Sequence, residues 1–368
     1  MLRKFFVAAC AVQAMLASSA QVASVTVDTA VAKNPDDQQK PPATLSITGS
    51  ADVYYKYDFA KTKANGFTSF TNSYNSFALG MASVKFEHKG DKIGAVLDLG
   101  FGQRAKEFSY ADEGITQAIK QLYLSYSPVD WLKFTAGTWA THVGYELLDP
   151  QANRNYSMSY MFTNGPFSHT GLKADITRGK HSFMAGISNP TDYRIPPEGF
   201  INKKFIVAQW GFSPNDKVKI YVNYVGGKAP DTSKINQFDA VVTAKISDQF
   251  SIGYNGTIAA VQAWDGTKNI SNKNWWGSAL YLNYDPVSWF GLTLREEYFN
   301  DKSYLKLTMA PAGCAMVAST LSANFKVSSF ILIPEIRYDH ASEKMFVNKN
   351  GDPASSATNI LLAAIYSF

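Results

Sequence analysis

The sequence is short of three features that would point to other classes of protein. Only 18% of its 368 residues are charged, and only 2 are cysteines, Cys10 and Cys314. Cys10 lies in a segment that we expect to be removed, so we expect neither an intramolecular disulfide nor a cysteine metal cluster. Beyond the N-terminus, no apolar run approaches the roughly 20 residues that a membrane-spanning helix needs.

Sequence motifs of enzymes are also missing. The five histidines show no H-E-x-x-H spacing for a metal, and no G-x-S-x-G segment provides a nucleophile. An outer-membrane phospholipase would need Ser and His together on the lipid-facing side, and neither His88 nor His181 can be paired in this way. We therefore predict no catalytic residue, no metal and no cofactor.

Residues 1–20 have the layout of a secretory signal peptide. A basic segment, Arg3-Lys4, precedes an apolar stretch and small residues that end at Ala20, where we expect cleavage. Removal of the two basic residues lowers the formal net charge of +5 by two units, which is too little charge to suggest a nucleic-acid partner. Residues 21–43 are polar and rich in proline, so we predict a flexible periplasmic tail.

Aromatic residues are abundant, and short apolar segments recur along the whole chain. The sequence has 24 Phe, 20 Tyr and 7 Trp. Residues 45–59 alternate strictly, with apolar side chains at odd positions and polar ones at even positions. Such alternation over about fifteen residues indicates a strand with lipid on one face and water on the other.

The connections between the predicted strands fall into two sizes that alternate without exception. Seven short turns, such as Lys89-Gly90-Asp91 and Pro128-Val129-Asp130, alternate with eight long polar loops. This pattern predicts an all-β fold, a transmembrane antiparallel β-barrel of about 16 strands over residues 44–368, with short periplasmic turns and long outer loops. The predicted strands span 44–59, 75–88, 92–102, 117–127, 131–141, 168–177, 180–189, 203–213, 217–226, 236–247, 249–260, 275–285, 289–299, 315–327, 329–340 and 355–368.

Two further patterns support a barrel in the outer membrane. Aromatic residues gather at both ends of the strands, as in interfacial girdles, and we include Trp139 and Trp275 in the band near the long loops. The last strand places Tyr366 and Phe368 on one apolar face. It resembles the C-terminal signal of outer-membrane barrels, which implies recognition by the barrel assembly machinery and closure against the first strand.

The same alternation predicts which side chains face the interior. Sixteen strands would leave an aqueous channel. The pore-wall candidates are Asp98, Asp175, Arg295, Glu297, Glu335 and Arg337. We expect a bulge at Pro334, because proline cannot donate to a β-ladder. The interior rows hold ten basic and nine acidic residues, so we expect no strong ion preference. We interpret the lysines near the short turns as solvated strand ends, with a mild cationic bias at the periplasmic mouth as the alternative.

Loop 142–167 is the candidate functional segment. It is the longest loop and too apolar to extend into water, and it also carries His142, Glu146, Asp149 and Arg154. We hypothesise that it packs against the inner wall, with Glu146 and Arg154 near the constriction and all four residues as constriction candidates. The alternatives are a lid over the outer mouth and a further membrane hairpin.

Residues around this loop resemble a known family. Residues 131–137 (WLKFTAG), followed by Gly144-Tyr145-Glu146, Asn155-Tyr156-Ser157 and His169-Thr170-Gly171, are similar to the putative β-barrel porin-2 (OmpL-like) family. The chain differs by having Trp139 and Tyr145 where smaller residues are common. The resemblance implies an outer-membrane porin of Gram-negative bacteria, and a homotrimer is common among sixteen-stranded porins.

We therefore predict a porin that lets small polar solutes or ions diffuse passively through the outer-membrane lipid. A closed barrel with a structural or surface-interaction role is the alternative. A transporter of hydrophobic solutes is a third interpretation, but it would need an apolar plug, which residues 21–43 are too short and too polar to form.

Overall fold

The computed structural model describes residues 43–229, 233–263, 266–268, 270 and 272–368. The predicted signal peptide and, except for Ala43, the predicted tail lie outside the described residues. Among the described residues, no helix has both the length and the apolar character needed to cross a bilayer.

Alternating side chains produce the long strands. In β1 (Thr44–Asp58) the even positions from Ser50 to Asp58 are buried, whereas the apolar side chains at odd positions are more exposed. Because successive strand residues point to opposite faces, one row faces the interior and the other faces outward. This confirms the prediction that the odd positions of β1 face outward and the even positions face the interior.

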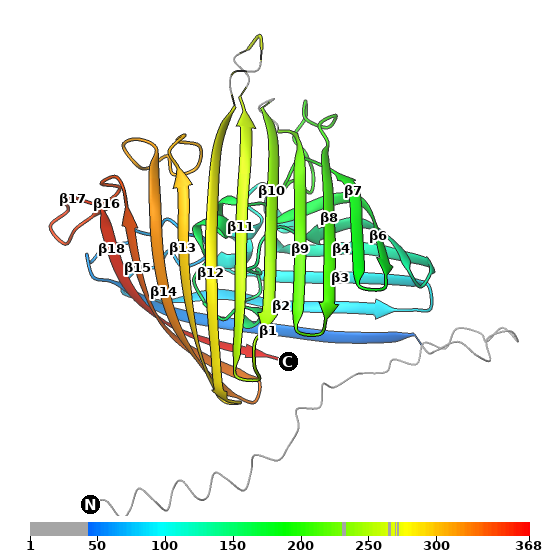
Figure 1. The fold of residues 1–368 in the computed structure, drawn as a ribbon, viewed down its shortest axis with the longest axis horizontal. Helices are drawn as coiled ribbons and strands as arrows, with labels where there is room; N and C mark the ends of the chain where they lie inside the picture. The colour runs from blue at the N-terminus through cyan, green and yellow to red at the C-terminus, as the bar shows by residue number, and fades with distance from the viewer. Residues whose placement is uncertain (1–42, 230–232, 264–265, 269, 271) are drawn as a thin grey trace, which may run out of the picture.

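Within the described residues, sixteen antiparallel strands close into one barrel, as predicted, and each strand pairs with the next barrel strand along the chain (Figure 1). The other barrel strands are β2 (Ser76–Lys89), β3 (Ile93–Phe101), β4 (Ile119–Val129), β5 (Leu132–Ala140), β6 (Ser168–Arg178), β7 (His181–Ser188), β8 (Phe205–Asn215), β9 (Val218–Lys228), β10 (Lys234–Lys245), β11 (Phe250–Gln262), β12 (Lys273–Val287), β13 (Phe290–Asp301), β14 (Cys314–Val327), β15 (Phe330–Ala341) and β18 (Ser356–Ser367). Two short strands, β16 (Phe346–Val347) and β17 (Pro353–Ala354), pair in the last long connection.

The first and last strands close the barrel, as predicted from the C-terminal sequence. β1 pairs with β18 from Ser50↔Ser367 to Asp58↔Asn359. Beyond the ladder, Gly49 and Phe368 exchange two backbone hydrogen bonds of 3.0 Å each. Tyr366 and Phe368 are exposed on the outer face, where the sequence placed them. Figure 1 shows the red end of the chain beside the blue β1.

Two predictions about the barrel wall are wrong. Trp139 and Trp275 are not part of an aromatic girdle, because they lie on the inward rows of β5 and β12 and are only 5% and 1% exposed. No bulge forms at Pro334 in the fully described strands β14 and β15. The ladder omits Pro334 and its neighbour Ile333, but it resumes from Ser322↔Glu335 to Phe325↔Leu332 without a register shift.

Long connections fill part of the barrel interior. Segments within 59–75, 102–118 and 141–167 lie there. The last two carry the short helices α2 (Gln103–Phe108), η1 (Gly114–Ala118), η2 (Pro150–Ala152) and α3 (Tyr160–Asn164). Phe70, Phe108, Met158 and Phe167 from these segments form a buried apolar cluster with Met81 of β2. Burial of these side chains removes apolar surface from water, so the connections have a hydrophobic reason to fold inward.

Candidate functional site

The connection after β5 runs down the inside of the barrel and back. It begins at the long-loop end of β5. Arg154 reaches Thr293, the fourth residue of β13 from the short-turn end, with an Nε–Oγ1 distance of 2.8 Å. The chain then turns back, and Tyr160 and Met161 lie beside Glu297, four residues further along β13. The loop therefore crosses much of the height of the wall.

Inward-facing carboxylates hold the backbone of this loop. Glu335 of β15 accepts the N–H groups of Tyr156 and Ser157, with a distance of 2.9 Å to the first. Glu297 of β13 accepts those of Tyr160 and Met161 at 2.8 and 2.7 Å. Each carboxyl group accepts two successive backbone N–H groups of the loop, so these contacts fix the loop to the wall.

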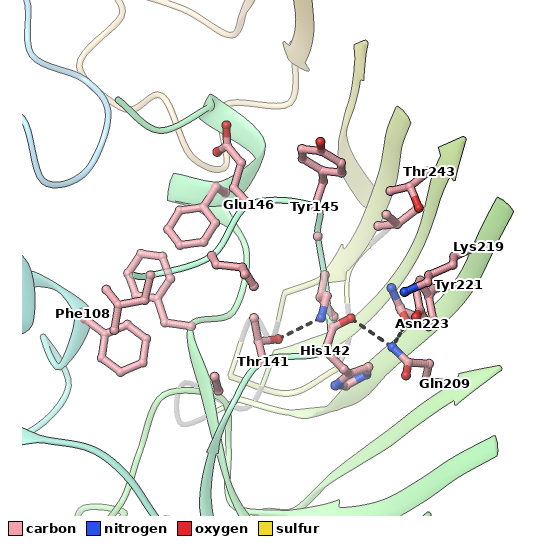
Figure 2. Close-up of a pocket in the computed structure, with 18 residues that line it drawn as sticks. Phe108, Thr141, His142, Tyr145, Glu146, Gln209, Lys219, Tyr221, Asn223 and Thr243 are labelled. Carbon is pink, nitrogen blue, oxygen red and sulfur yellow. Dashed lines mark hydrogen bonds between the residues drawn. The ribbon is translucent and has the colours of Figure 1, made fainter. Parts of the chain in front are cut away.

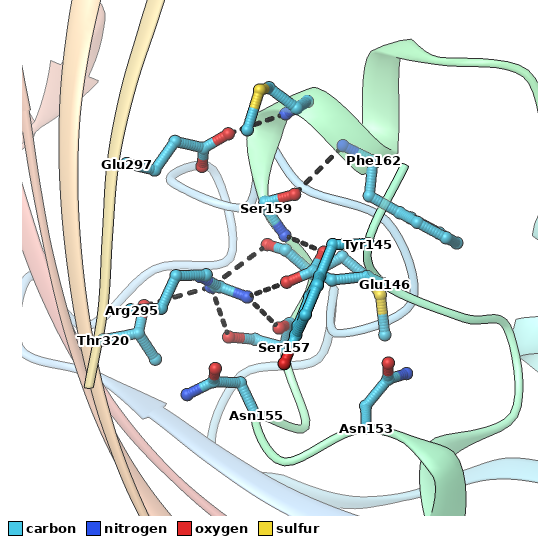
Figure 3. A network of polar contacts seen from close by, with 12 residues as sticks. Tyr145, Glu146, Asn153, Asn155, Ser157, Ser159, Phe162, Arg295, Glu297 and Thr320 are labelled. Carbon is cyan, nitrogen blue, oxygen red and sulfur yellow. Dashed lines mark hydrogen bonds and ion pairs between the residues drawn. The ribbon is translucent and has the colours of Figure 1, made fainter. Parts of the chain in front are cut away.

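Arg295 lies at the centre of the polar contacts between loop and wall (Figure 3). Its guanidinium group donates to Glu146 Oε1 at 2.5 Å, to the carbonyl oxygen of Ser157 at 2.7 Å and to Thr320 Oγ1 at 3.0 Å. Glu146 also accepts the N–H of Ser159 at 2.8 Å. Arg295 is fully buried, and this set of acceptors compensates for its lost hydration.

A second layer supports the loop from its other side. Arg104 of α2 is fully buried, donates to the carbonyl oxygen of Leu148 and lies 4.8 Å from the ring centre of Tyr156. The Tyr156 hydroxyl donates to Asp52 of β1. Sequence reasoning missed Arg104 and Tyr156 as anchors. The alternation of β1 predicts that Asp52 faces the interior, but it does not predict which residue Asp52 contacts there.

The pore-wall interpretation is wrong for most of the six candidates. Arg295, Glu297, Glu335 and Arg337 face inward, but the loop covers them and they are at most 4% exposed. Asp98 is also buried, 3.0 Å from Lys120 Nζ. Asp175 alone of the six is partly exposed, and it pairs with Lys173 at 3.2 Å. These charges mainly anchor internal segments, because the loop lies between them and the remaining open space.

The four constriction candidates of the loop are dispersed. His142 and Glu146 line a cavity beside the loop. Asp149 pairs with Lys120 at 2.5 Å, away from the other three. Arg154 pairs with Asp285 at 2.6 Å and contacts Thr293 of β13, which is two residues from the Glu146 partner Arg295 on the same inward row.

Open space remains between the loop and strands β8–β10. A cavity of about 530 Å³ lies there, towards the short-turn end (Figure 2). Its wall residues are Gln209, Lys219, Tyr221, Asn223, Val241 and Thr243. The connection after β5 contributes residues 141–148, Phe162 and Phe167. Sequence reasoning placed Lys219 on an inward row but did not single out this wall. The uncharged polar residues of these strands carry no motif that marks them.

A second cavity of about 210 Å³ lies towards the long loops, next to Trp275 and Lys306. A space of only about 10 Å³ lies between the two and shares lining residues with both. Here the backbone N–H of Gly144 donates to Asp239 Oδ1 at 3.1 Å, and that of Tyr145 donates to Asn255 Oδ1 at 3.3 Å. Tyr145 also stacks on Tyr281 with ring centres 4.0 Å apart.

His142 ties the start of the loop to β9. Its Nε2–H donates to the carbonyl oxygen of Tyr224 at 3.1 Å, and its ring lies 5.1 Å from that of His169. Burial lowers the pKa of His142 to about 4, so the imidazole is neutral near pH 7. No group of three or more His, Cys, Asp or Glu side chains in the described part of the chain is placed to hold a metal ion.

A closed sixteen-stranded barrel with an apolar outer row, polar inner rows and a loop folded inside defines an outer-membrane barrel of the porin class. The chain belongs to the family described as putative beta-barrel porin-2, OmpL-like, whose model matches residues 44–368. The search of curated proteins gives no match.

Solved outer-membrane proteins share the fold at low sequence identity. An anion-selective porin from Comamonas acidovorans is 9% identical, with 89% of this chain and 100% of that chain covered and a TM-score of 0.60. The outer-membrane channel DcaP of Acinetobacter baumannii is 13% identical, with 89% and 97% covered and a TM-score of 0.60. OmpT of Vibrio cholerae in its trimer form is 12% identical, with 89% and 100% covered and a TM-score of 0.58.

Proposed function

We propose that the protein is a porin through which small polar solutes and ions diffuse passively across the outer membrane. The observation that carries this proposal is the water-accessible space beside the inward loop. Two cavities of about 530 and 210 Å³ lie one above the other between the loop and strands β8–β11. Gln209, Asn223 and Thr243 give the larger cavity a polar wall, which suits hydrated solutes.

The loop after β5 sets the width of this route in our proposal. Val143, Gly144 and Tyr145 face Asp239 and Asn255 across the space of about 10 Å³. We expect His142 and Glu146 to act at the constriction, because both line the larger cavity directly below it. Asp149 and Arg154 instead hold the loop in place through their ion pairs.

The first experiment is a conductance measurement on the refolded protein in a planar lipid bilayer, with deletion of residues 147–162 as the test variant. We expect discrete conductance steps for the wild type and larger steps for the variant, because the deletion removes most of the chain that covers the β13–β15 wall. A shift of the SDS-resistant band on heating checks that both barrels are folded. Unchanged conductance in a folded variant would contradict a constricting loop.

A closed barrel with a structural or surface-interaction role is the second candidate. The narrow space of about 10 Å³, crossed by two hydrogen bonds from the loop backbone, favours it. A folded wild-type barrel without any conductance would support this second function over the porin.

We also propose a homotrimer and export with cleavage near Ala20. One structure with a similar fold is described as a trimer form, which makes the trimer a reasonable expectation. Crosslinking in detergent and the intact mass of the mature chain test these two points.

A further inference from the structure

Acidic and basic side chains of the barrel interior differ in burial. Most of the acidic ones are buried, whereas most of the basic ones are at least partly exposed to solvent. Of the nine acidic residues that the sequence placed on the inward rows, seven are buried and two, Glu87 and Asp175, are partly exposed; the structure adds the buried Asp301, the partly exposed Asp285 and the buried Lys120 to these rows. Of the ten basic residues, only Lys56, Arg295 and Arg337 are buried. The other seven are partly or fully exposed: Lys85, Lys92, Lys133, Lys173, Lys219, Lys245 and Lys326.

Four of these seven lysines pair with acids that are themselves at least partly exposed: Lys85 with Glu87, Lys173 with Asp175, Lys245 with Asp248 and Lys326 with Asp285. Lys92, Lys133 and Lys219 form no ion pair with a described residue.

Hydrogen bonding explains this difference in burial. A folded-in loop presents backbone N–H groups that need acceptors, and a carboxylate accepts several of them whereas an ammonium group accepts none. Glu297 and Glu335 are used in this way by the loop after β5. The same loop gives Asp52 the hydroxyl of Tyr156 and gives Asp239 the backbone N–H of Gly144 at 3.1 Å. Packing of internal segments therefore removes negative charge from the water-filled space.

Lys219 is the open base that lines the main cavity. It lies on β9, on the wall opposite the loop, and its side chain is exposed (Figure 2). It forms no ion pair with any residue that the structure describes. The acidic residue of the same cavity, Glu146, has its charge compensated by Arg295 at 2.5 Å. His142 is neutral near pH 7, so the cavity has an uncompensated positive charge.

We propose that the open lumen selects small anions and that Lys219 is its main selectivity-determining residue. This inference rests on the proposed porin function and adds the class of solute. A solute that passes between the loop and β8–β10 must pass Lys219, whereas the buried carboxylates behind the loop are separated from it by protein. The exposed lysines near the short turns extend the same positive potential towards the periplasmic mouth.

The test is the reversal potential of the refolded protein in a KCl gradient, for the wild type, Lys219→Gln and Lys219→Glu. The wild type should be more permeable to Cl⁻ than to K⁺. Lys219→Gln, which removes one positive charge, should lower the Cl⁻/K⁺ permeability ratio about twofold. Lys219→Glu, which reverses that charge, should lower the ratio about fourfold. The preference should weaken as salt rises, because the screening length falls from about 10 Å at 0.1 M to about 3 Å at 1 M.

Lys228→Glu is the matched control. Lys228 lies on the same strand as Lys219, but it is exposed on the outward row at the opposite end. This variant changes the total charge by the same amount without changing the lumen, and its permeability ratio should equal that of the wild type. If Lys219→Glu and Lys228→Glu change the permeability ratio by the same amount, the role of Lys219 is contradicted.

The outcomes also separate this inference from the proposed function. A wild type that conducts without preferring Cl⁻ overturns anion selectivity and leaves the porin intact. A folded wild type that does not conduct overturns both. Both lysine variants are expected to fold, because Lys219 is exposed and no described partner depends on it, and the heat-shifted SDS band checks this.

Discussion

Arg295 of β13 and Glu146 of the loop after β5 form an ion pair of 2.5 Å in which the arginine is fully buried. The two residues are 149 positions apart in the sequence. Each charge has lost its hydration, so each depends on the other. The pair is therefore more important for the position of the loop than an exposed ion pair would be.

Glu146→Gln should release part of the loop. The substitution removes the counter-charge that is hydrogen-bonded to the buried guanidinium group of Arg295, and breaking a buried pair in this way costs about 3–5 kcal/mol. We expect larger or noisier single-channel conductance and faster proteolysis within residues 147–162. The control is Asp248→Asn, which breaks the exposed pair of Lys245 and Asp248 and should cost at most about 1 kcal/mol. A Glu146→Gln channel with wild-type conductance and proteolysis would show that the pair does not hold the loop.

Acid should loosen the start of the loop through His142. Burial lowers the pKa of His142 from 6.5 to about 4, so the buried position binds a proton more weakly than the released loop does. The stabilisation is complete above pH 6.5 and is lost as the pH falls through 4, by up to about 1.4 kcal/mol per pH unit. The protonated ring would still donate to Tyr224, but it would be a buried charge.

The measurement is single-channel conductance between pH 7 and pH 4 for the wild type and His142→Gln. The wild type should become noisier or more open at low pH, and the variant should respond less. His169, whose ring lies beside that of His142, is present in both proteins, so a response that remains in the variant is assigned to other groups, His169 among them. Identical pH profiles would rule out His142 as the cause.

Gly49→Ala should weaken closure of the barrel. A Cβ atom at position 49 would lie 2.6 Å from Cζ of Phe368 and 2.6 Å from the carbonyl oxygen of Ser83. Overpacking of this kind costs about 1–3 kcal/mol. We expect the SDS-resistant barrel to unfold at a lower temperature, as read from band shifts on a gel.

Ala51→Val is the control for this prediction. Ala51 lies two residues further on the same outward row, is exposed and pairs with Tyr366. It should leave the unfolding temperature nearly unchanged. Adding Phe368→Ala to Gly49→Ala should restore part of the loss if the aromatic ring causes it. If Gly49→Ala unfolds at the same temperature as the wild type, the strand ends adjust to the added methyl group without a cost in stability.

Alternation and connection length were sufficient to predict the barrel. The two rows of β1 and β13 and the pairing of the last strand with the first follow from local patterns, and the structure confirms them. Position near a strand end does not determine which face an aromatic side chain occupies, so Trp139 and Trp275 can lie near the long loops and still face inward. Proline lacks a backbone N–H donor, so Pro334 interrupts the ladder between β14 and β15. A bulge would also need an extra residue in one strand, and the unchanged register shows that there is none.

The site was harder to predict for a physical reason. An inward row predicts that Glu335 or Asp239 avoids lipid, but it does not reveal whether water or another part of the chain covers that side chain. The partners of Glu335 are backbone N–H groups, which every non-proline residue has and no motif marks. A count of charges therefore suggested a balanced pore, whereas the folded loop covers mainly one sign.

The anchors of the loop after β5 come from both ends of the chain. Tyr156 contacts Asp52 of the first strand and Glu335 of β15, and Tyr160 contacts Asp339, which is 179 residues later. A chain that is still being inserted has no complete binding surface for this loop until its last strands are in place. The width of the opening is thus decided late in assembly, and a barrel that stops short of closure would be a less selective leak in the membrane.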